Sequence, residues 1–148
     1  MSRRPCPFCA INNGALRASV IYEDEHFMII MDAYPLSSGH VLIIPRAHHD
    51  RISALSDEHQ SKLFDLGRKV MSAMIRAGFG EDGCNILLND GKAANQTVPH
   101  IHLHIIPRKK HDFLRSLPKL ALHVTGLMGR QEKRATLDEQ ARQIAKYF

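Results

Sequence analysis

The chain has 148 residues, of which 44% are hydrophobic and 24% are charged, and its net charge is +5. This composition is typical of one globular domain and excludes an intrinsically disordered chain. No apolar run approaches the roughly 20 residues that a membrane-spanning helix needs, and Arg3 and Arg4 are not followed by the apolar segment of a secretory signal. We therefore expect a cytoplasmic protein with no membrane partner.

The first half of the chain predicts three strands and one long helix. Runs rich in β-branched and other apolar residues predict strands at residues 19–22, 27–31 and 40–44. Pro45 ends the third strand, because proline has no N–H to donate to a sheet. Ser56 is a favourable helix N-cap, and the apolar residues after it recur at three- and four-residue spacing over about six turns.

The second half predicts two further strands, at residues 84–89 and 100–106, and a last helix that Thr136 caps. Three strands, a helix and two more strands form a pattern that favours antiparallel pairing. We therefore expect an α+β fold with a five-stranded antiparallel sheet, one long helix and a short helix near the C-terminus.

The positive charge is concentrated in the tail of the chain. Residues 108–134 hold eight cations and two anions, so the rest of the chain is close to neutral. A solvated surface is the first interpretation of such a segment, and binding of an anionic partner such as a nucleic acid is the second. Because the cations lie in the tail, they say little about the body of the protein.

Two of the three cysteines, Cys6 and Cys9, form a Cys-x-x-Cys motif, and the third, Cys84, stands in an apolar run. A redox motif of this kind is expected between a strand and a helix, but almost no chain precedes this one. The pair is better explained as half of a metal site, which needs two further ligands. Cys84 is expected to be a small core residue.

The most informative stretch carries His100, His102 and His104 at alternate positions. Side chains alternate between the faces of a strand, so the three imidazoles share one face, about 6.6 Å from one to the next, and the apolar residues between them share the other. Three interpretations follow: a solvated surface, a bound metal ion, or nucleophilic catalysis by one imidazole while others hold a charged substrate. Spacing alone does not decide between metal and catalysis.

Two segments together resemble the signature of the histidine triad (HIT) superfamily. Residues 96–108 read Gln-Thr-Val-Pro-His-Ile-His-Leu-His-Ile-Ile-Pro-Arg, and residues 38–46 contain a strand similar to the family's Gly-His-x-Leu-x-x-Pro. Asp32 and Asn89 also match, and the Cys-x-x-Cys occurs in the zinc-bearing branch of the family. The sequence departs from the pattern at Asn95, where the family usually has glycine.

The resemblance spans residues 6 to about 113 and implies a HIT fold. We accordingly divide the chain into a HIT domain over residues 1–112 and a basic, partly helical C-terminal extension over residues 113–148. The resemblance also implies a homodimer. The implied activity is cleavage at the α-phosphate of a purine nucleotide derivative, either a dinucleoside polyphosphate or a nucleoside phosphoramidate, through a covalent nucleotidyl-histidine.

The resemblance assigns a role to each matching residue. His102 corresponds to the nucleophile, and an imidazole with a pKa near 6.5 is neutral enough at pH 7 to attack. His104 and His40 would donate hydrogen bonds to the phosphate oxygens, and Thr97 would guide the leaving group. The nucleotide-binding set would comprise Asp32, Asn89, Gln96, Thr97 and His104. Within that set Asp32 would bind the ribose hydroxyls, although without the family a turn-initiating aspartate before Pro35 would be the favoured interpretation.

The resemblance also implies a structural zinc ion held by Cys6, Cys9, His48 and His100, because two thiolates and two imidazoles complete a tetrahedral site. His49 is the adjacent rival of His48. A hydrolase and a phosphorylase would share the first step, so the residues do not separate them. An alternative function is a nucleotide-binding regulatory module whose slow turnover is incidental, and the turnover rate would separate it from an enzyme.

Overall fold

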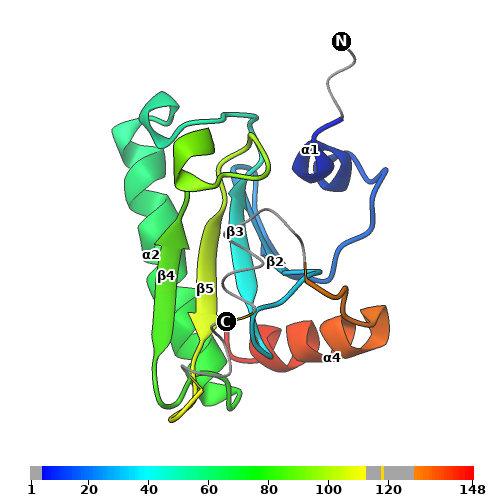
Figure 1. Ribbon diagram of the computed structural model, residues 1–148. Helices are drawn as coiled ribbons and strands as arrows, with labels where there is room; N and C mark the ends of the chain where they lie inside the picture. Colours follow the sequence, from blue (N-terminus) through cyan, green and yellow to red (C-terminus); the bar gives the residue numbers. More distant parts are fainter. Residues whose placement is uncertain (1–4, 113–117, 119–128) are drawn as a thin grey trace.

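The computed structural model describes residues 5–112, 118 and 129–148. Five strands form one antiparallel sheet in the order β1-β2-β3-β5-β4 (Figure 1). The strands are β1 Val20–Glu23, β2 Phe27–Met31, β3 Val41–Pro45, β4 Cys84–Leu88 and β5 Leu103–Pro107. The predicted α+β class and the five-stranded antiparallel sheet are therefore confirmed.

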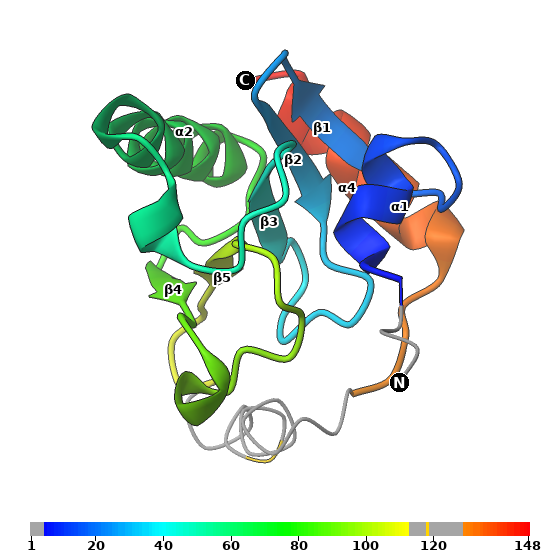
Figure 2. The ribbon, with the colours of Figure 1, turned by 90° about the horizontal axis from the view of Figure 1, so that it is seen from above.

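Helices cover both faces of this sheet. The helices are α1 Pro7–Asn12, α2 Asp57–Arg76 and α4 Arg134–Ala145, with short 3-10 helices at Ile52–Ala54 and Lys92–Ala94. Helix α2 packs on β3 and β5, and α4 packs on β1 and β2. Seen from above, α1 lies on the side of the sheet opposite α2 (Figure 2). As the sequence predicts, α2 begins after Ser56, whose hydroxyl accepts the N–H of His59.

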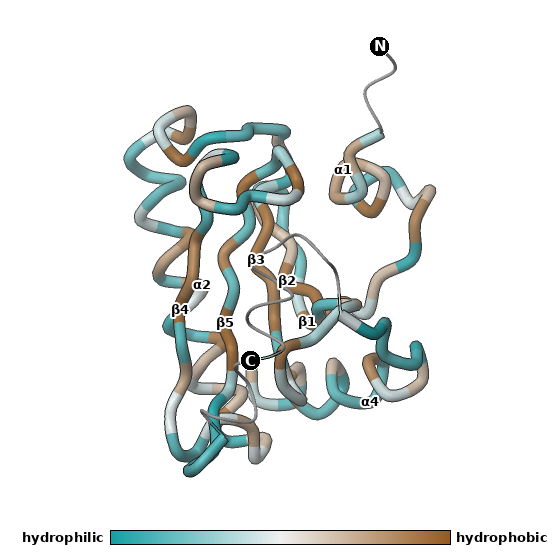
Figure 3. The backbone as a smooth tube through the Cα atoms, viewed as in Figure 1, coloured by the Kyte–Doolittle hydropathy of each residue, from teal (hydrophilic) through white to brown (hydrophobic). Residues whose placement is uncertain are grey.

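Alternate residues of the central strands face two separate hydrophobic clusters. The larger cluster joins Ile29, Ile43 and Ile105 to residues of α2 and to three residues of α4. Those residues of α4 are Leu137, Ala141 and Ile144. The smaller cluster joins Phe8 of α1 to the opposite side of β2 and β3. Figure 3 shows the hydrophobic residues concentrated along these central strands. Helix α4 thus shares the core of the sheet, although it lies beyond the boundary expected at residue 112.

Three details differ from the sequence-based expectations. Helix α1 was not expected at all. The last helix begins at Arg134 after Lys133, so Thr136 lies within it and is not its cap. Strand β5 begins at Leu103 and not at residue 100, because the N–H of Ile101 donates to the carbonyl of His49 and not to a neighbouring strand. Part of the extension, residues 113–117 and 119–128, lies outside the described residues.

No helix in the described part of the chain combines the length and the apolar character needed to cross a membrane.

One carboxylate fastens the turn between β1 and β2 to helix α2. Oδ1 of Asp24 accepts the backbone N–H groups of His26 and Phe27 at 2.8 and 2.7 Å. Oδ2 accepts the Tyr22 hydroxyl at 3.1 Å and lies 2.8 Å from Nζ of Lys62 on α2. Burial alone would raise the pKa of Asp24, but the Lys62 ammonium and the hydrogen bonds outweigh it and hold the pKa well below its usual range.

We predict that Asp24→Asn lowers the free energy of unfolding by about 1–3 kcal/mol at pH 7. Because the pKa of the folded state lies below that of the unfolded state, this stabilisation is complete above about pH 5 and is lost as the pH falls through the acid range. Chemical denaturation at several pH values measures it. Asp65→Asn is the control, since Asp65 also pairs with cations but on the exposed face of α2. An equal cost of Asp24→Asn at pH 7 and pH 2 would contradict the account.

Candidate functional site

A cavity of about 340 Å³ lies on the face of the sheet that α1 covers. Most of its wall is apolar, with Phe8 and Ile11 from α1 on one side and Ile30 and Leu42 from the sheet on the other. Polar groups are few, and they include Asp32, Thr97, His102 and His104. A mostly apolar cavity of this size with a few convergent polar groups is typical of a small-molecule site.

His102 is held in one tautomer by the backbone. Its Nδ1 lies 2.7 Å from the carbonyl oxygen of His100. A carbonyl only accepts hydrogen bonds, so Nδ1 carries the proton and Nε2 keeps its lone pair. The ring is buried, lines the cavity and packs against Phe8 at a centroid distance of 5.1 Å. The residue is therefore arranged to present an unprotonated nitrogen.

His40 and His104 form a directed chain of hydrogen bonds. The N–H of Leu36 donates to Nδ1 of His40 at 3.0 Å, so the proton of a neutral His40 ring sits on Nε2. That Nε2 lies 2.9 Å from Nδ1 of His104 and donates to it. The proton of a neutral His104 ring is then on Nε2, which makes this residue of the cavity wall a hydrogen-bond donor.

Asp32 fits both interpretations that its sequence position allows. Its Oδ1 accepts the N–H of Tyr34 at 2.8 Å, as a turn-initiating aspartate does. Its Oδ2 lies 3.5 Å from Nε2 of His40 and 3.9 Å from Nδ1 of His104. The residue is buried and lines the cavity. One oxygen thus shapes the turn while the other lies beside the two histidines.

The loop between β4 and β5 carries the remaining predicted residues, and of these Thr97 lines the cavity whereas Gln96 and Asn89 do not. The side-chain oxygen of Gln96 accepts the N–H of Gly91 at 2.7 Å and its amide donates to the carbonyl of Asp50 at 2.9 Å, so it organises the loop. Asn89 follows β4 and is not among the residues that form the cavity wall. Asn95 has a φ of 60°, so the asparagine adopts the left-handed conformation that glycine takes easily.

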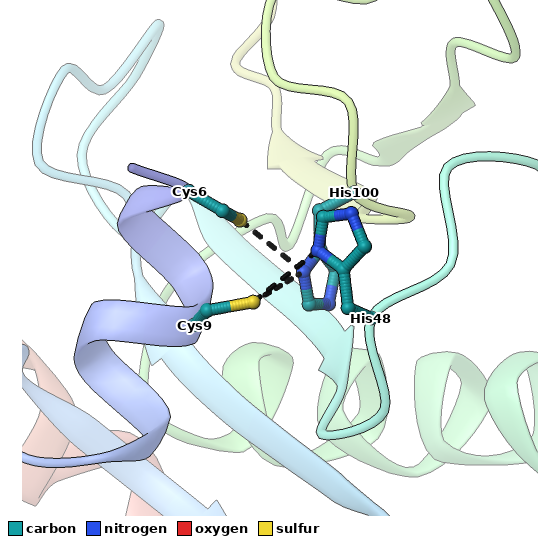
Figure 4. A group of neighbouring side chains, drawn as sticks. All are labelled: Cys6, Cys9, His48 and His100. Atoms are coloured by element: carbon teal, nitrogen blue, oxygen red, sulfur yellow. Dashed lines mark hydrogen bonds between the residues drawn. The ribbon is translucent and has the colours of Figure 1, made fainter. Parts of the chain in front are cut away.

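The four residues expected to hold a metal lie together at the start of α1 (Figure 4). Sγ of Cys6 lies 3.4 Å from Nδ1 of His100, and Sγ of Cys9 lies 3.7 Å from the same nitrogen and 3.2 Å from Nδ1 of His48. In a tetrahedral zinc site a sulfur and a nitrogen ligand are about 3.6 Å apart. The donor set and its spacing therefore fit zinc. The second histidine of the cluster is His48 and not its neighbour His49.

His100 connects this cluster to His102. Its Nε2 donates to the carbonyl of Pro45 at 2.8 Å, which leaves the lone pair of Nδ1 directed at the two cysteines. Burial lowers the pKa of His100 to about 4, so the ring is neutral at pH 7, as a metal ligand must be. The carbonyl of the same residue holds His102. His100 thus belongs both to the cluster with the two cysteines and to the hydrogen bond that orients His102.

Sequence reasoning did not identify two parts of the cavity wall. The first is α1, for which a proline just inside a helix start was an available signal: Cys6 is the N-cap and Pro7 the first helical residue. The second comprises Gln131 and Arg134, which lie beyond the resemblance. No motif marks these two residues, because their place depends on how α4 packs.

A family model for the HIT domain matches residues 13–111. Among curated relatives, an adenylylsulfatase of Arabidopsis thaliana is 36% identical over 80% of this chain and 59% of its own length. An adenosine 5′-monophosphoramidase of Schizosaccharomyces pombe is 34% identical over 73% of this chain and 77% of its own. Among solved structures, a zinc-bound histidine triad family protein from Mycobacterium smegmatis has a TM-score of 0.75 and 34% identity and covers 97% of this chain and 92% of its own. The chain belongs to the HIT domain family.

Proposed function

We propose that the chain cleaves purine nucleotide derivatives at the α-phosphate, with His102 as the nucleophile, and releases a nucleoside monophosphate. The observation that carries the proposal is the hydrogen bond from Nδ1 of His102 to the carbonyl of His100, because it leaves Nε2 unprotonated in the cavity wall. The names of the Arabidopsis thaliana and Schizosaccharomyces pombe relatives support this class of reaction, since both describe hydrolysis of an adenylyl compound.

The reaction has two displacements at phosphorus. In the first, the lone pair of Nε2 of His102 forms a bond to the α-phosphorus, and the bond to the leaving oxygen or nitrogen breaks with its electrons on the leaving group. Thr97 guides the leaving group, which takes up a proton from solvent. In the second, a water oxygen bonds to the phosphorus and loses its proton to solvent, and the phosphorus–nitrogen bond breaks with its electrons on Nε2. The imidazole thereby returns to its Nδ1–H form.

The other cavity residues hold the substrate. Nε2–H of His104 donates to a non-bridging phosphate oxygen, and His40 keeps that proton in place because it donates to Nδ1 of His104. The carboxylate of Asp32 accepts the ribose hydroxyls. Asn89 lies outside the cavity wall, so its expected place beside the phosphates has no support in the geometry, and Gln96 acts through the loop that it organises.

We predict that His102→Asn lowers kcat by at least about 10³-fold, because asparagine has no nucleophilic nitrogen. The affinity for adenosine monophosphate should change little, since binding in the ground state uses other atoms.

Steady-state assays with a dinucleoside polyphosphate and an adenosine phosphoramidate, with and without orthophosphate, measure turnover and separate a hydrolase from a phosphorylase. His26→Asn, in the turn between β1 and β2, is the control. Normal turnover in His102→Asn would rule out the mechanism.

We also propose that Cys6, Cys9, His48 and His100 bind one structural zinc ion per chain. The spacing of the donor atoms and the orientation of His100 support this. When bound, the ion would fasten α1 to the segment that precedes β5. All four positions of a tetrahedral site would be filled, so the ion itself would have no position for substrate.

We predict that Cys9→Ala reduces the zinc content of purified protein from about one ion per chain to a small fraction. The free energy of unfolding should fall with it, because binding of a structural metal is coupled to folding. Elemental analysis and thermal unfolding measure the two effects. The control is Cys84→Ala, which removes a thiol at the start of β4 and should leave the zinc content unchanged. Wild-type protein that contains no zinc when purified without chelators would contradict the proposal.

We further propose a homodimer formed at the outer edge of β4. Within the described residues β4 pairs with β5 alone, so its other edge is open to a second copy. Ile86 of β4 is 49% exposed, which is unusual for a residue with a large apolar side chain in the middle of a strand.

We predict that Ile86→Lys converts the dimer to a monomer, because a charge at this edge would have to be desolvated on pairing. Analytical ultracentrifugation at micromolar concentration measures the mass. Val20→Lys serves as the control, because Val20 is also exposed but lies on β1 at the opposite edge of the sheet. A monomeric wild type, or a variant that dimerises as tightly as the wild type, would refute this interface.

A further inference from the structure

The cavity wall includes two residues from the C-terminal extension, Gln131 and Arg134. We propose that Arg134 binds the purine base of the nucleotide, so that the extension forms part of the substrate site. The inference rests on the proposed function for the orientation of the nucleotide, and it assigns a task to a basic residue that lies outside the matched HIT domain.

Hydrogen bonds hold the Arg134 guanidinium in a fixed place. Nη1 donates to the Ser19 hydroxyl oxygen and Nη2 donates to the carbonyl of Arg17, both at 3.1 Å. The Ser19 hydroxyl in turn donates to Asp138, one turn further along α4, at 2.6 Å. Asp138 also pairs with the guanidinium of Arg17 at 3.3 Å. Arg134 is half-buried, and a half-buried, doubly anchored guanidinium loses little further freedom when a ligand binds.

Packing of α4 fixes the position of this residue relative to the cavity. Leu137 of the same helix is buried in the larger hydrophobic cluster. Just before the helix, the N–H of Glu132 donates to the carbonyl of Ala33 at 3.0 Å. Ala33 lines the cavity and follows Asp32, the proposed ribose ligand. The segment that carries Arg134 therefore runs along the cavity next to the place where the ribose would bind.

The order of groups along the cavity leaves the base as the partner of Arg134. His102 and His104 would hold the α-phosphate and Asp32 the ribose, so the base would occupy the remaining part of the cavity. Ile11 and Leu16 also line the cavity, and their apolar side chains suit the faces of a planar ring.

Arginine suits the base for two chemical reasons. The guanidinium is planar and cationic, so it stacks on an aromatic ring. It carries only hydrogen-bond donors, which match the ring-nitrogen acceptors of a purine such as N7. Two of its five N–H groups are used by Ser19 and Arg17, and the fork provides three more.

Binding of adenosine monophosphate and of ribose 5-phosphate, measured by calorimetry, tests the inference, because the second ligand keeps the ribose and the phosphate and has a hydroxyl in place of the base. We expect Arg134→Met to weaken adenosine monophosphate binding by about tenfold and ribose 5-phosphate binding by less than about twofold. Arg134→Lys should fall between wild type and Arg134→Met for adenosine monophosphate, since it keeps the charge but loses the planar fork. Arg142→Met is the control, because Arg142 lies on the same helix and pairs with Glu139 on the surface.

Three results would overturn the inference. The first is an equal loss of affinity for both ligands, which would mean that Arg134 only maintains the shape of the cavity. The second is no loss of adenosine monophosphate affinity in Arg134→Met. The third is a wild-type protein that binds adenosine monophosphate no more tightly than ribose 5-phosphate. If Arg134→Met does not fold, Arg134→Gln, which keeps an amide donor, is measured in its place. Because neither ligand is turned over, an inactive wild type that binds adenosine monophosphate would refute the proposed function and not this inference.

Discussion

The hydrogen bond between Nδ1 of His102 and the carbonyl of His100 is the interaction on which the proposed chemistry depends. A neutral imidazole has one proton and two nitrogens, and only the nitrogen without the proton can attack. The carbonyl decides which one it is. That carbonyl is itself fixed, because the ring of His100 donates to Pro45 and faces the two cysteines of α1.

The same arrangement explains why α1 lies where it does. Cys6 and Cys9 bring the helix against His100, and Phe8 between them packs on both His100 and His102. Phe8 is also part of the cavity wall. A metal ion at the cysteines would therefore stabilise the backbone that orients His102 and also the apolar wall of the cavity, although it would not itself touch His102.

Alternation in a strand made much of this site predictable. Ile101, Leu103 and Ile105 lie in the larger hydrophobic cluster, while His102 and His104 line the cavity on the other face. The sequence could not show that His100 leaves the strand ladder, because this depends on the hydrogen bond from the N–H of Ile101 to the carbonyl of His49, which belongs to a distant part of the chain. Nor could local patterns place Arg134, whose position follows from contacts between α4 and the segment before β1. Spacing identifies residues that share one element, and packing between distant segments decides the rest.

A measurement of which ring nitrogen of His102 carries the proton tests the proposed chemistry best. Nitrogen-15 NMR of uniformly labelled protein distinguishes a protonated from an unprotonated ring nitrogen, and comparison with His102→Asn assigns the signals. The account predicts that, at neutral pH in the zinc-loaded protein, Nδ1 of His102 carries the proton and Nε2 does not. A ring protonated at Nε2 under these conditions would contradict it, because the nitrogen that faces the substrate would then have no lone pair with which to attack.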